Sequence, residues 1–182
     1  PKGYQITQSD SPLCENGYIN LDSNKKVRIE RAHLEEDAGK TIHTLEGTAL
    51  IDYNRCGAPL LEIVSAPDMS SSEEALNYLK SLKEIIISTK GSDCDMEKGN
   101  LRVDLNISVN KRGDQELGTR REVKNVNSFR NIEKAINYEF EAQCTLLESG
   151  HLIKQETLLW DDNNGVTKSI RSKEDAHDYR YF

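Results

Sequence analysis

The sequence lacks the features that most directly assign a protein to a class. No run of about 18 apolar residues occurs, so no segment is long enough to cross a membrane as a helix. Basic residues are outnumbered, at 24 Lys and Arg against 31 Asp and Glu, which gives the 182 residues a net charge of -7. Because phosphate contacts need basic surface, this balance argues against a protein whose main task is to grip a nucleic-acid backbone.

Closely spaced cysteines are also missing. A zinc site needs tighter ligand spacing than these cysteines offer, so no metal is assigned to sulfur. Widely spaced cysteines in an acidic chain are typical of reduced thiols in an intracellular protein. There is no signal-peptide pattern, and because Pro1 is not a natural start we expect a piece of a longer protein. The cysteines are Cys14, Cys56, Cys94 and Cys144.

The common catalytic signatures do not occur. The sequence contains no G-x-x-x-x-G-K-[ST] phosphate loop and no G-x-G-x-x-G, G-x-S-x-G or H-E-x-x-H motif. A nucleotide site could therefore not rest on a phosphate loop, which leaves carboxylates on strands as the candidate groups. No histidine has a spaced partner, so surface or packing positions are expected for all four: His33, His43, His151 and His177.

Strands separated by turns are predicted in the first part of the chain, and two helices follow. The strands cover 14–19, 26–34, 48–54 and 60–64. The first helix opens with Ser71 and Glu74 as a capping box, carries an apolar stripe and ends before Gly91. The second helix runs from about 128 to 149, and Gly150 follows it. Its apolar side is expected to hold Phe129, Ile132, Ile136, Phe140 and Leu147.

Hairpins complete the predicted fold. Apolar and polar residues alternate over 101–109, a period of two that indicates a half-buried strand, and 118–126 is expected to return beside it. A last hairpin pairs 155–160 with 166–171 around the turn dipeptide Asn164-Gly165. Strands in succession with helices inserted predict an α+β fold, with a mainly antiparallel sheet and helices packed on one face.

Carboxylates on the wet face of this sheet are the candidate metal ligands. Asp104 and Glu122 occupy such positions on adjoining strands, and Mg²⁺ prefers hard oxygen donors. Glu62 interrupts an apolar strand, and 35–37 is a dense acidic run. From the residues alone these signals are weak, and ordinary structural roles stay open: Asp104 as the salt-bridge partner of Arg120, Glu62 on an exposed strand face, and the acidic run as a turn or helix start.

The register of the central hairpin follows from this hypothesis. If Asp104 lies directly opposite Glu122, both carboxylates face away from the core at close range. Two like charges at that distance call for a metal or an arginine beside them. We therefore expect the pair to line one open cleft.

Several segments, in order along the whole chain, resemble the catalytic domain of the B subunit of the Asp/Glu-tRNA amidotransferases. They are 3–8 (GYQITQ), 33–40 (HLEEDAGK), 52–55 (DYNR), 59–65 (PLLEIVS), 122–129 (EVKNVNSF) and 177–182 (HDYRYF). Some are short, but their joint occurrence is highly specific.

The resemblance implies an enzyme that uses ATP and Mg²⁺ to phosphorylate the side-chain carboxylate of Glu-tRNA(Gln) or Asp-tRNA(Asn). Ammonia from the amidase subunit of the complex then displaces phosphate, and a third, small subunit bridges the two. The implied fold is similar to that of glutamine synthetase and the guanido kinases. Residues 1–182 would form a single catalytic domain, with a strand before Pro1 and helical and tail domains after Phe182.

Carried over by residue, the family's metal and nucleotide carboxylates fall on four acids of this chain: Glu36, Glu62, Asp104 and Glu122. If so, the first two should approach the other pair. Three basic residues are our own candidates for supporting cations at the nucleotide: Arg102, Arg120 and Lys124. The family's Glu and His upstream of Pro1 are not in this chain. The chain also has Lys98 where relatives usually carry Glu, a reversal of charge beside the predicted strand.

A second hypothesis is a scaffold or tRNA-binding module of the same complex, without chemistry of its own. Mg²⁺-dependent ATP turnover would separate the two hypotheses. The implied location is intracellular, in the cytoplasm of a bacterium or in a mitochondrion or plastid of a eukaryote. The residues do not distinguish an Asp-tRNA from a Glu-tRNA substrate.

Overall fold

The computed structural model describes residues 4–44, 46–170 and 180–181, which form two compact units. One unit comprises Pro1–Asp68 with Asp175–Phe182, and the other comprises Met69–Glu174. None of the helices in the described ranges is long and apolar enough to cross a membrane. His177 and the end of the expected strand 166–171 lie outside the described residues. A single catalytic domain over 1–182 stays a prediction.

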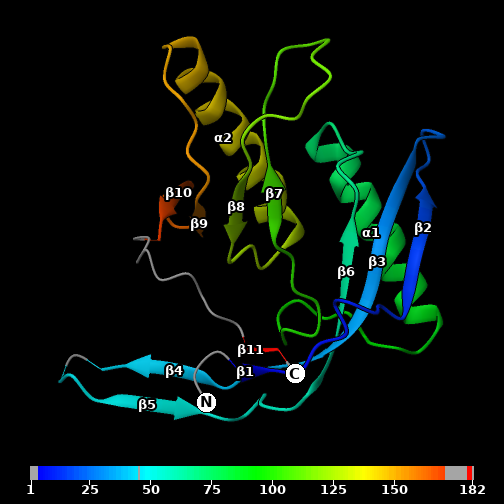
Figure 1. Cartoon of the computed structure of the whole chain (residues 1–182), viewed down its shortest axis with the longest axis vertical. Coiled ribbons are helices and arrows are strands. Elements are labelled where there is room, and N and C mark those ends of the chain that lie inside the picture. The colour runs from blue at the N-terminus through cyan, green and yellow to red at the C-terminus, as the bar shows by residue number, and fades with distance from the viewer. Residues whose placement is uncertain (1–3, 45, 171–179, 182) are drawn as a thin grey trace. The chain divides into compact units, whose positions relative to one another are not determined.

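The first unit is built around an antiparallel sheet in which β3 (Lys26–Glu36) lies between β2 (Cys14–Asn20) and β6 (Pro59–Ser65) (Figure 1). These strands confirm the ones predicted at 14–19, 26–34 and 60–64, although β3 extends further toward its C-terminal end. The pairing of β3 with β6 is interrupted by a bulge between Ile29 and Arg31. A bulge bends a strand locally and increases its twist.

Two smaller strand pairs belong to the same unit. β4 (Lys40–His43) and β5 (Ala49–Asp52) form an antiparallel hairpin. β5 is shorter than the strand predicted at 48–54, because the chain turns after Asp52 and the Cys56 amide donates to the Tyr53 carbonyl. The other pair is parallel and joins β1 (Tyr4–Gln5) to β11 (Arg180–Tyr181).

The second unit contains a sheet with the strand order β10-β9-β8-β7. The pair β8–β9 is parallel and the other two pairs are antiparallel. A parallel pair needs a crossover connection, and α2 supplies it between β8 and β9. The result is an α+β arrangement with mainly antiparallel pairing, as predicted. The elements are β7 (Leu105–Ile107), β8 (Arg121–Lys124), α2 (Phe129–Glu148), β9 (Thr157–Asp161) and β10 (Val166–Ser169).

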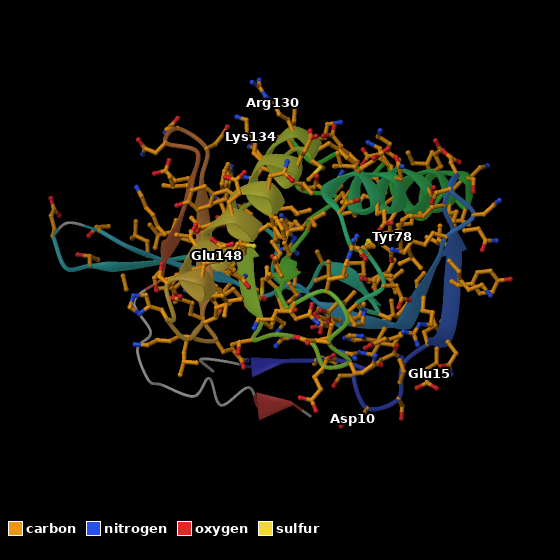
Figure 2. The ribbon with its side chains drawn as sticks, turned by 90° about the horizontal axis from the view of Figure 1, so that it is seen from above. Asp10, Glu15, Tyr78, Arg130, Lys134 and Glu148 are labelled. Atoms are coloured by element: carbon orange, nitrogen blue, oxygen red, sulfur yellow. The ribbon has the colours of Figure 1, made fainter. Side chains whose placement is uncertain are left out.

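The helix α1 (Ser72–Ser88) begins where its capping residues predict. The Ser71 hydroxyl accepts a hydrogen bond from the Glu74 amide at 3.2 Å, and Glu74 Oε2 accepts one from the Ser70 amide at 2.6 Å. The carboxylate thus binds the residue before the cap rather than the cap itself. Tyr78 of α1 points inward (Figure 2), and burial raises its pKa to about 12.

The apolar side predicted for α2 is only partly buried. Ile132 is fully buried, whereas Phe140 and Leu147 are 54% and 42% exposed. Two polar residues, Glu139 and Gln143, are fully buried in their place. The pattern of apolar residues did not predict their burial. Polar side chains are buried where they find hydrogen-bond partners, and the sheet beneath α2 provides these partners.

The hairpin of β7 and β8 forms, but its predicted register is wrong. Asn106, not Asp104, lies opposite Glu122, and Leu105 lies opposite Val123. The shift is by two residues, so it keeps each side chain on its predicted face. Leu105 and Val123 are buried, while Asp104 and Asn106 are exposed. The ladder spans only Leu105–Ile107, so the strand predicted over 101–109 is much shorter in the structure.

Candidate metal and nucleotide site

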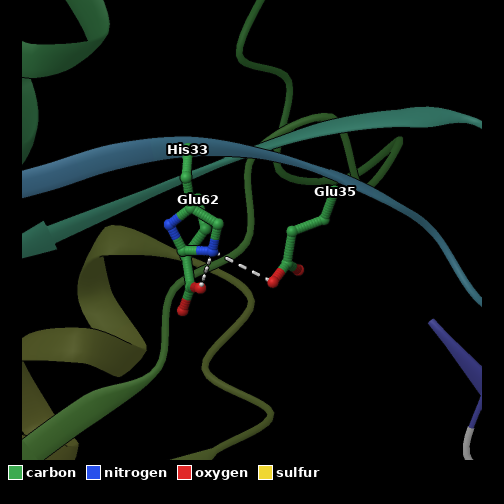
Figure 3. Close-up of side chains that lie close together, drawn as sticks. All are labelled: His33, Glu35 and Glu62. Atoms are coloured by element: carbon green, nitrogen blue, oxygen red, sulfur yellow. Dashed lines mark hydrogen bonds and ion pairs between the residues drawn. The ribbon is translucent and has the colours of Figure 1, made fainter. Parts of the chain in front are cut away.

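Three potential metal ligands meet on β3 and β6 of the first unit. His33 and Glu35 share a face of β3 because they are two residues apart, and Glu62 of β6 lies directly opposite His33. Figure 3 shows His33 Nε2 facing both carboxylates. This nitrogen is 3.0 Å from Glu62 Oε2 and 3.1 Å from Glu35 Oε1. One ligand atom from each residue lies within 4.8 Å of the other two.

The chemistry of this cluster fits a divalent cation. Two carboxylates and an imidazole supply hard and borderline donors. His33 is 1% exposed and its Nδ1 has no hydrogen-bond partner among the described residues. The side chain of Glu62, in contrast, is 49% exposed, so the cluster is open to solvent on one side. The Thr7 hydroxyl donates to Glu35 Oε1 at 3.1 Å and helps to orient that carboxylate.

Glu36 and Glu62 were predicted to be ligands of one site, but they do not lie together in the structure. Glu36 lies opposite Pro59, three positions along β3 from His33. Because side chains alternate between faces, Glu36 projects from the face opposite Glu62. The acid of the 35–37 run that reaches the cluster is Glu35. The resemblance had singled out its neighbour.

A second carboxylate cluster lies on the exposed face of the sheet in the other unit. Asp104 and Glu122 do converge, and the group between them is the ammonium of Lys124. Lys124 Nζ is 2.7 Å from Asp104 Oδ2 and 3.0 Å from Glu122 Oε1. The cation that this pair was expected to need is therefore part of the chain. That both clusters line one cleft stays a prediction.

Lys124 and Glu122 are each held by more than one contact. Burial lowers the pKa of Lys124, but its hydrogen bonds to Asp104 and Glu122 outweigh burial and raise that pKa overall. The ammonium is therefore protonated at neutral pH. The other oxygen of Glu122, Oε2, accepts a hydrogen bond from the Thr157 hydroxyl at 3.0 Å. Thr157 is opposite Glu122 in the parallel pair of β8 and β9.

The two arginines predicted to assist at the nucleotide are exposed. Arg102 precedes Asp104 by two positions, in the segment before the short strand β7. Arg120 directly precedes β8, and within the described ranges it forms no ion pair. The alternative role of Asp104, as the salt-bridge partner of Arg120, is not the one in the structure, because Lys124 takes that place. A role for either arginine with phosphate stays a prediction.

The face of the sheet behind Glu122 holds a buried polar network that the sequence did not predict. Glu139 of α2 accepts hydrogen bonds from Arg121, Gln143 and Thr167 at 3.1, 3.2 and 3.1 Å. Gln143 also donates to the Ile107 carbonyl of β7 at 3.1 Å. α2 is thus tied to three strands of the sheet. The available signal in the sequence was the spacing of Glu139 and Gln143, which are four residues apart and therefore share one face of α2.

Comparison with known proteins identifies the family. The model for the GatB/GatE catalytic domain matches residues 1–182. The B subunit of the aspartyl/glutamyl-tRNA(Asn/Gln) amidotransferase of Clostridium tetani is 54% identical over 186 residues, covering 100% of this chain and 39% of that protein. A B subunit of the same name, numbered 1, in Clostridium acetobutylicum is 55% identical over 185 residues with the same coverage of both chains.

A third relative, from Caldicellulosiruptor bescii, is named as the B subunit of the same enzyme and is 54% identical over 186 residues. This chain covers 39% of its length, so the chain spans about two fifths of these curated relatives. Both the family model and these relatives cover the chain from end to end. The chain belongs to the GatB/GatE catalytic domain family.

Proposed function

We propose that this chain activates the side-chain carboxylate of Glu-tRNA(Gln) or Asp-tRNA(Asn) with ATP and Mg²⁺, as the catalytic part of an amidotransferase B subunit. The support from sequence is the family match, which covers the whole chain. The observation that carries the chemistry is the contact of His33 with Glu35 and Glu62. The imidazole and the two carboxylates together supply three donor atoms that one divalent cation could join.

The proposed reaction has two steps. An oxygen of the substrate carboxylate attacks the γ-phosphorus of ATP, the bond from that phosphorus to the β–γ bridging oxygen breaks, and ADP leaves. Ammonia then attacks the carbonyl carbon of the acyl phosphate, a proton is lost, and inorganic phosphate departs with the former carboxylate oxygen. The amide remains on the tRNA.

The first step requires two anions to approach, so positive charge has to be supplied. A divalent cation bound by Glu35, Glu62 and His33 would offset that repulsion and the charge on the transferred group. Glu122 and Asp104 would bind a divalent cation that contacts the phosphates. Arg102 and Arg120 are exposed candidates for contact with the nucleotide. The antiparallel sheets would carry these groups as in the glutamine synthetase and guanido kinase folds, which use no phosphate loop.

We also infer the partners that the family resemblance implies. An amidase subunit would release ammonia from glutamine, and a small third subunit would join the two. The relatives' designation as B subunits fits such an assembly. The partner that carries the substrate is the aminoacylated end of a misacylated tRNA. Translation requires an intracellular location, in the cytoplasm if the source is bacterial and in a mitochondrion or plastid otherwise.

The test is Glu62→Gln in the assembled amidotransferase, with the two half-reactions measured separately. The substitution keeps the size of the side chain and removes the charge. We expect ATP-dependent amidation of misacylated tRNA to fall at least about tenfold, while glutamine hydrolysis by the amidase subunit continues. Glu15→Gln, at an exposed position on β2, is the matched control and should leave both unchanged. Full amidation by the Glu62 variant would overturn the proposal, and the chain would then be a scaffold or a tRNA-binding module.

A further inference from the structure

Lys124 joins two acidic side chains that come from different parts of the second unit. Asp104 immediately precedes β7, while Glu122 and Lys124 are two residues apart on β8 and so share its exposed face. Lys124 Nζ lies 2.7 Å from Asp104 Oδ2 and 3.0 Å from Glu122 Oε1. The two carboxylates are thus paired with one ammonium, which leaves one negative charge unbalanced.

The cluster is open enough for its cation to be replaced. The side chains of Asp104, Lys124 and Glu122 are 51%, 40% and 31% exposed, respectively. An ammonium on a flexible four-carbon stem can move without any change in the backbone. A dication near the carboxylates would meet the like charge of Lys124, and at short range such repulsion favours the departure of the weaker binder.

Glu122 does not depend on Lys124 alone for its position. Thr157 donates to Glu122 Oε2 at 3.0 Å, whereas Lys124 binds Oε1. The carboxylate can therefore keep its orientation when the ammonium moves. One oxygen is held by a neutral donor that does not compete with a cation, and the other is the one that the ammonium covers.

We propose that Lys124 is an exchangeable counter-cation, which a divalent cation displaces from Asp104 and Glu122 and which then binds the anionic phosphate of the substrate. The proposal rests on the function proposed above, because it takes the phosphate to be that of ATP. In the bridged arrangement the three side chains carry a net charge of one negative unit. Exchange leaves the carboxylates neutralised by the dication and frees the ammonium, so the site changes from repelling to attracting an anion.

The first experiment follows the ammonium itself. In the assembled enzyme, lysines are labelled briefly with an amine-reactive reagent and located by mass spectrometry, with and without Mn²⁺. Labelling of Lys124 should rise with Mn²⁺, and Asp104→Asn should abolish this dependence on Mn²⁺. Lys168, which is ion-paired with Asp161, is the internal control and should not respond. Labelling of Lys124 that is unchanged or lower with Mn²⁺ would overturn the proposal.

The second experiment uses Lys124→Met in a Glu62→Gln background, so that the His33 cluster contributes little to the measured Mn²⁺ binding. Calorimetry should show Mn²⁺ affinity rising about tenfold, since a competing charge is gone. In the Glu62 wild-type background, the same Met substitution should lower ATP-dependent phosphorylation at least about tenfold. The substitution should therefore raise Mn²⁺ affinity and lower phosphorylation. If Lys124 were only a phosphate ligand or a structural residue, Mn²⁺ affinity would fall or stay unchanged. Mn²⁺ binding that is unchanged or weaker contradicts the exchange.

Two features keep these results interpretable. The labelling experiment needs no variant of Lys124, so it shows whether Mn²⁺ displaces the ammonium even if Lys124→Met does not fold. Neither labelling nor calorimetry depends on catalysis. A wild-type enzyme without ATP-dependent phosphorylation would therefore refute the proposed function, while the Mn²⁺ response of Lys124 would still show whether the exchange occurs.

Discussion

The fully buried carboxylate of Glu139 on α2 accepts a hydrogen bond from Arg121 of β8, with 3.1 Å between Oε1 and the guanidinium nitrogen. Arg121 points to the opposite side of β8 from Glu122, its neighbour in the strand. The ion pair of Arg121 with Glu139 thus holds β8 from the face opposite to Glu122 and Lys124. Gln143 donates to Glu139 and to the Ile107 carbonyl, which ties β7 into the same network.

Removing the charge of Glu139 should be costly. Glu139→Gln leaves the Arg121 guanidinium, whose side chain is only 14% exposed, with Glu156 as its remaining carboxylate partner. We expect the free energy of unfolding to fall by about 3 kcal/mol, as when one partner of a buried pair is lost. Urea denaturation measures this change. Glu133→Gln, on the exposed side of α2, should change stability by less than about 0.5 kcal/mol.

The same pair offers a stricter check on the cause of that loss. Arg121→Met combined with Glu139→Gln removes both charges of the pair and keeps an amide oxygen that can accept from Gln143 or Thr167. This double variant should be more stable than Glu139→Gln alone, because the guanidinium that lost a partner is also gone. A double variant less stable than the single one would show that packing, rather than charge, dominates at this position.

The ion pair of Arg28 with Asp68 predicts a dependence of stability on pH. Hydrogen bonds from Arg28 lower the pKa of Asp68 to about 2 in the folded protein, against about 4 in an unfolded chain. A lowered folded pKa contributes stability that is fully present above pH 4 or so and is lost as the pH falls toward about 2. Asp68→Asn should therefore flatten the stability profile between about pH 4 and 2. Identical slopes for the two proteins would contradict this assignment.

Gly118 should tolerate no side chain. A Cβ atom built at this position would collide with the backbone carbonyl of Val109, which cannot move without disturbing the hairpin. We expect Gly118→Ala to lower the free energy of unfolding by about 1–3 kcal/mol, measured by urea denaturation. Gly17→Ala is the control, because its Cβ would meet only the Ile29 side chain at an ordinary 3.6 Å. Equal losses at the two positions would rule out the collision as the cause.

Local signals in the sequence predicted the helices well. Ser71 caps α1 as predicted, α2 begins within one residue of its predicted start with Ser128 as its cap, and Gly150 follows α2 with a φ of 76°. A cap depends only on residues within one turn, so neighbouring residues suffice to identify it. The faces of the β7–β8 hairpin were predictable for the same reason, since alternation is a local pattern.

Contacts between distant residues were not predictable in this way. His33 has no spaced partner in the sequence, and it gains Glu62 only because β3 and β6 pair in one particular register. The register of β7 and β8 was deduced by placing Asp104 opposite Glu122. The structure instead relieves that repulsion with Lys124, which lies on the same strand as Glu122. Charge balance among side chains thus allowed more than one register.

An isotope experiment tests the central claim most directly. Misacylated tRNA whose side-chain carboxylate carries ¹⁸O is amidated by the assembled enzyme with ATP and Mg²⁺, and the released phosphate is analysed by mass spectrometry. Activation through an acyl phosphate transfers one ¹⁸O atom to each phosphate, and Glu62→Gln should remove this labelled product. Phosphate without ¹⁸O, or equal labelling by the Glu62 variant, would contradict the account.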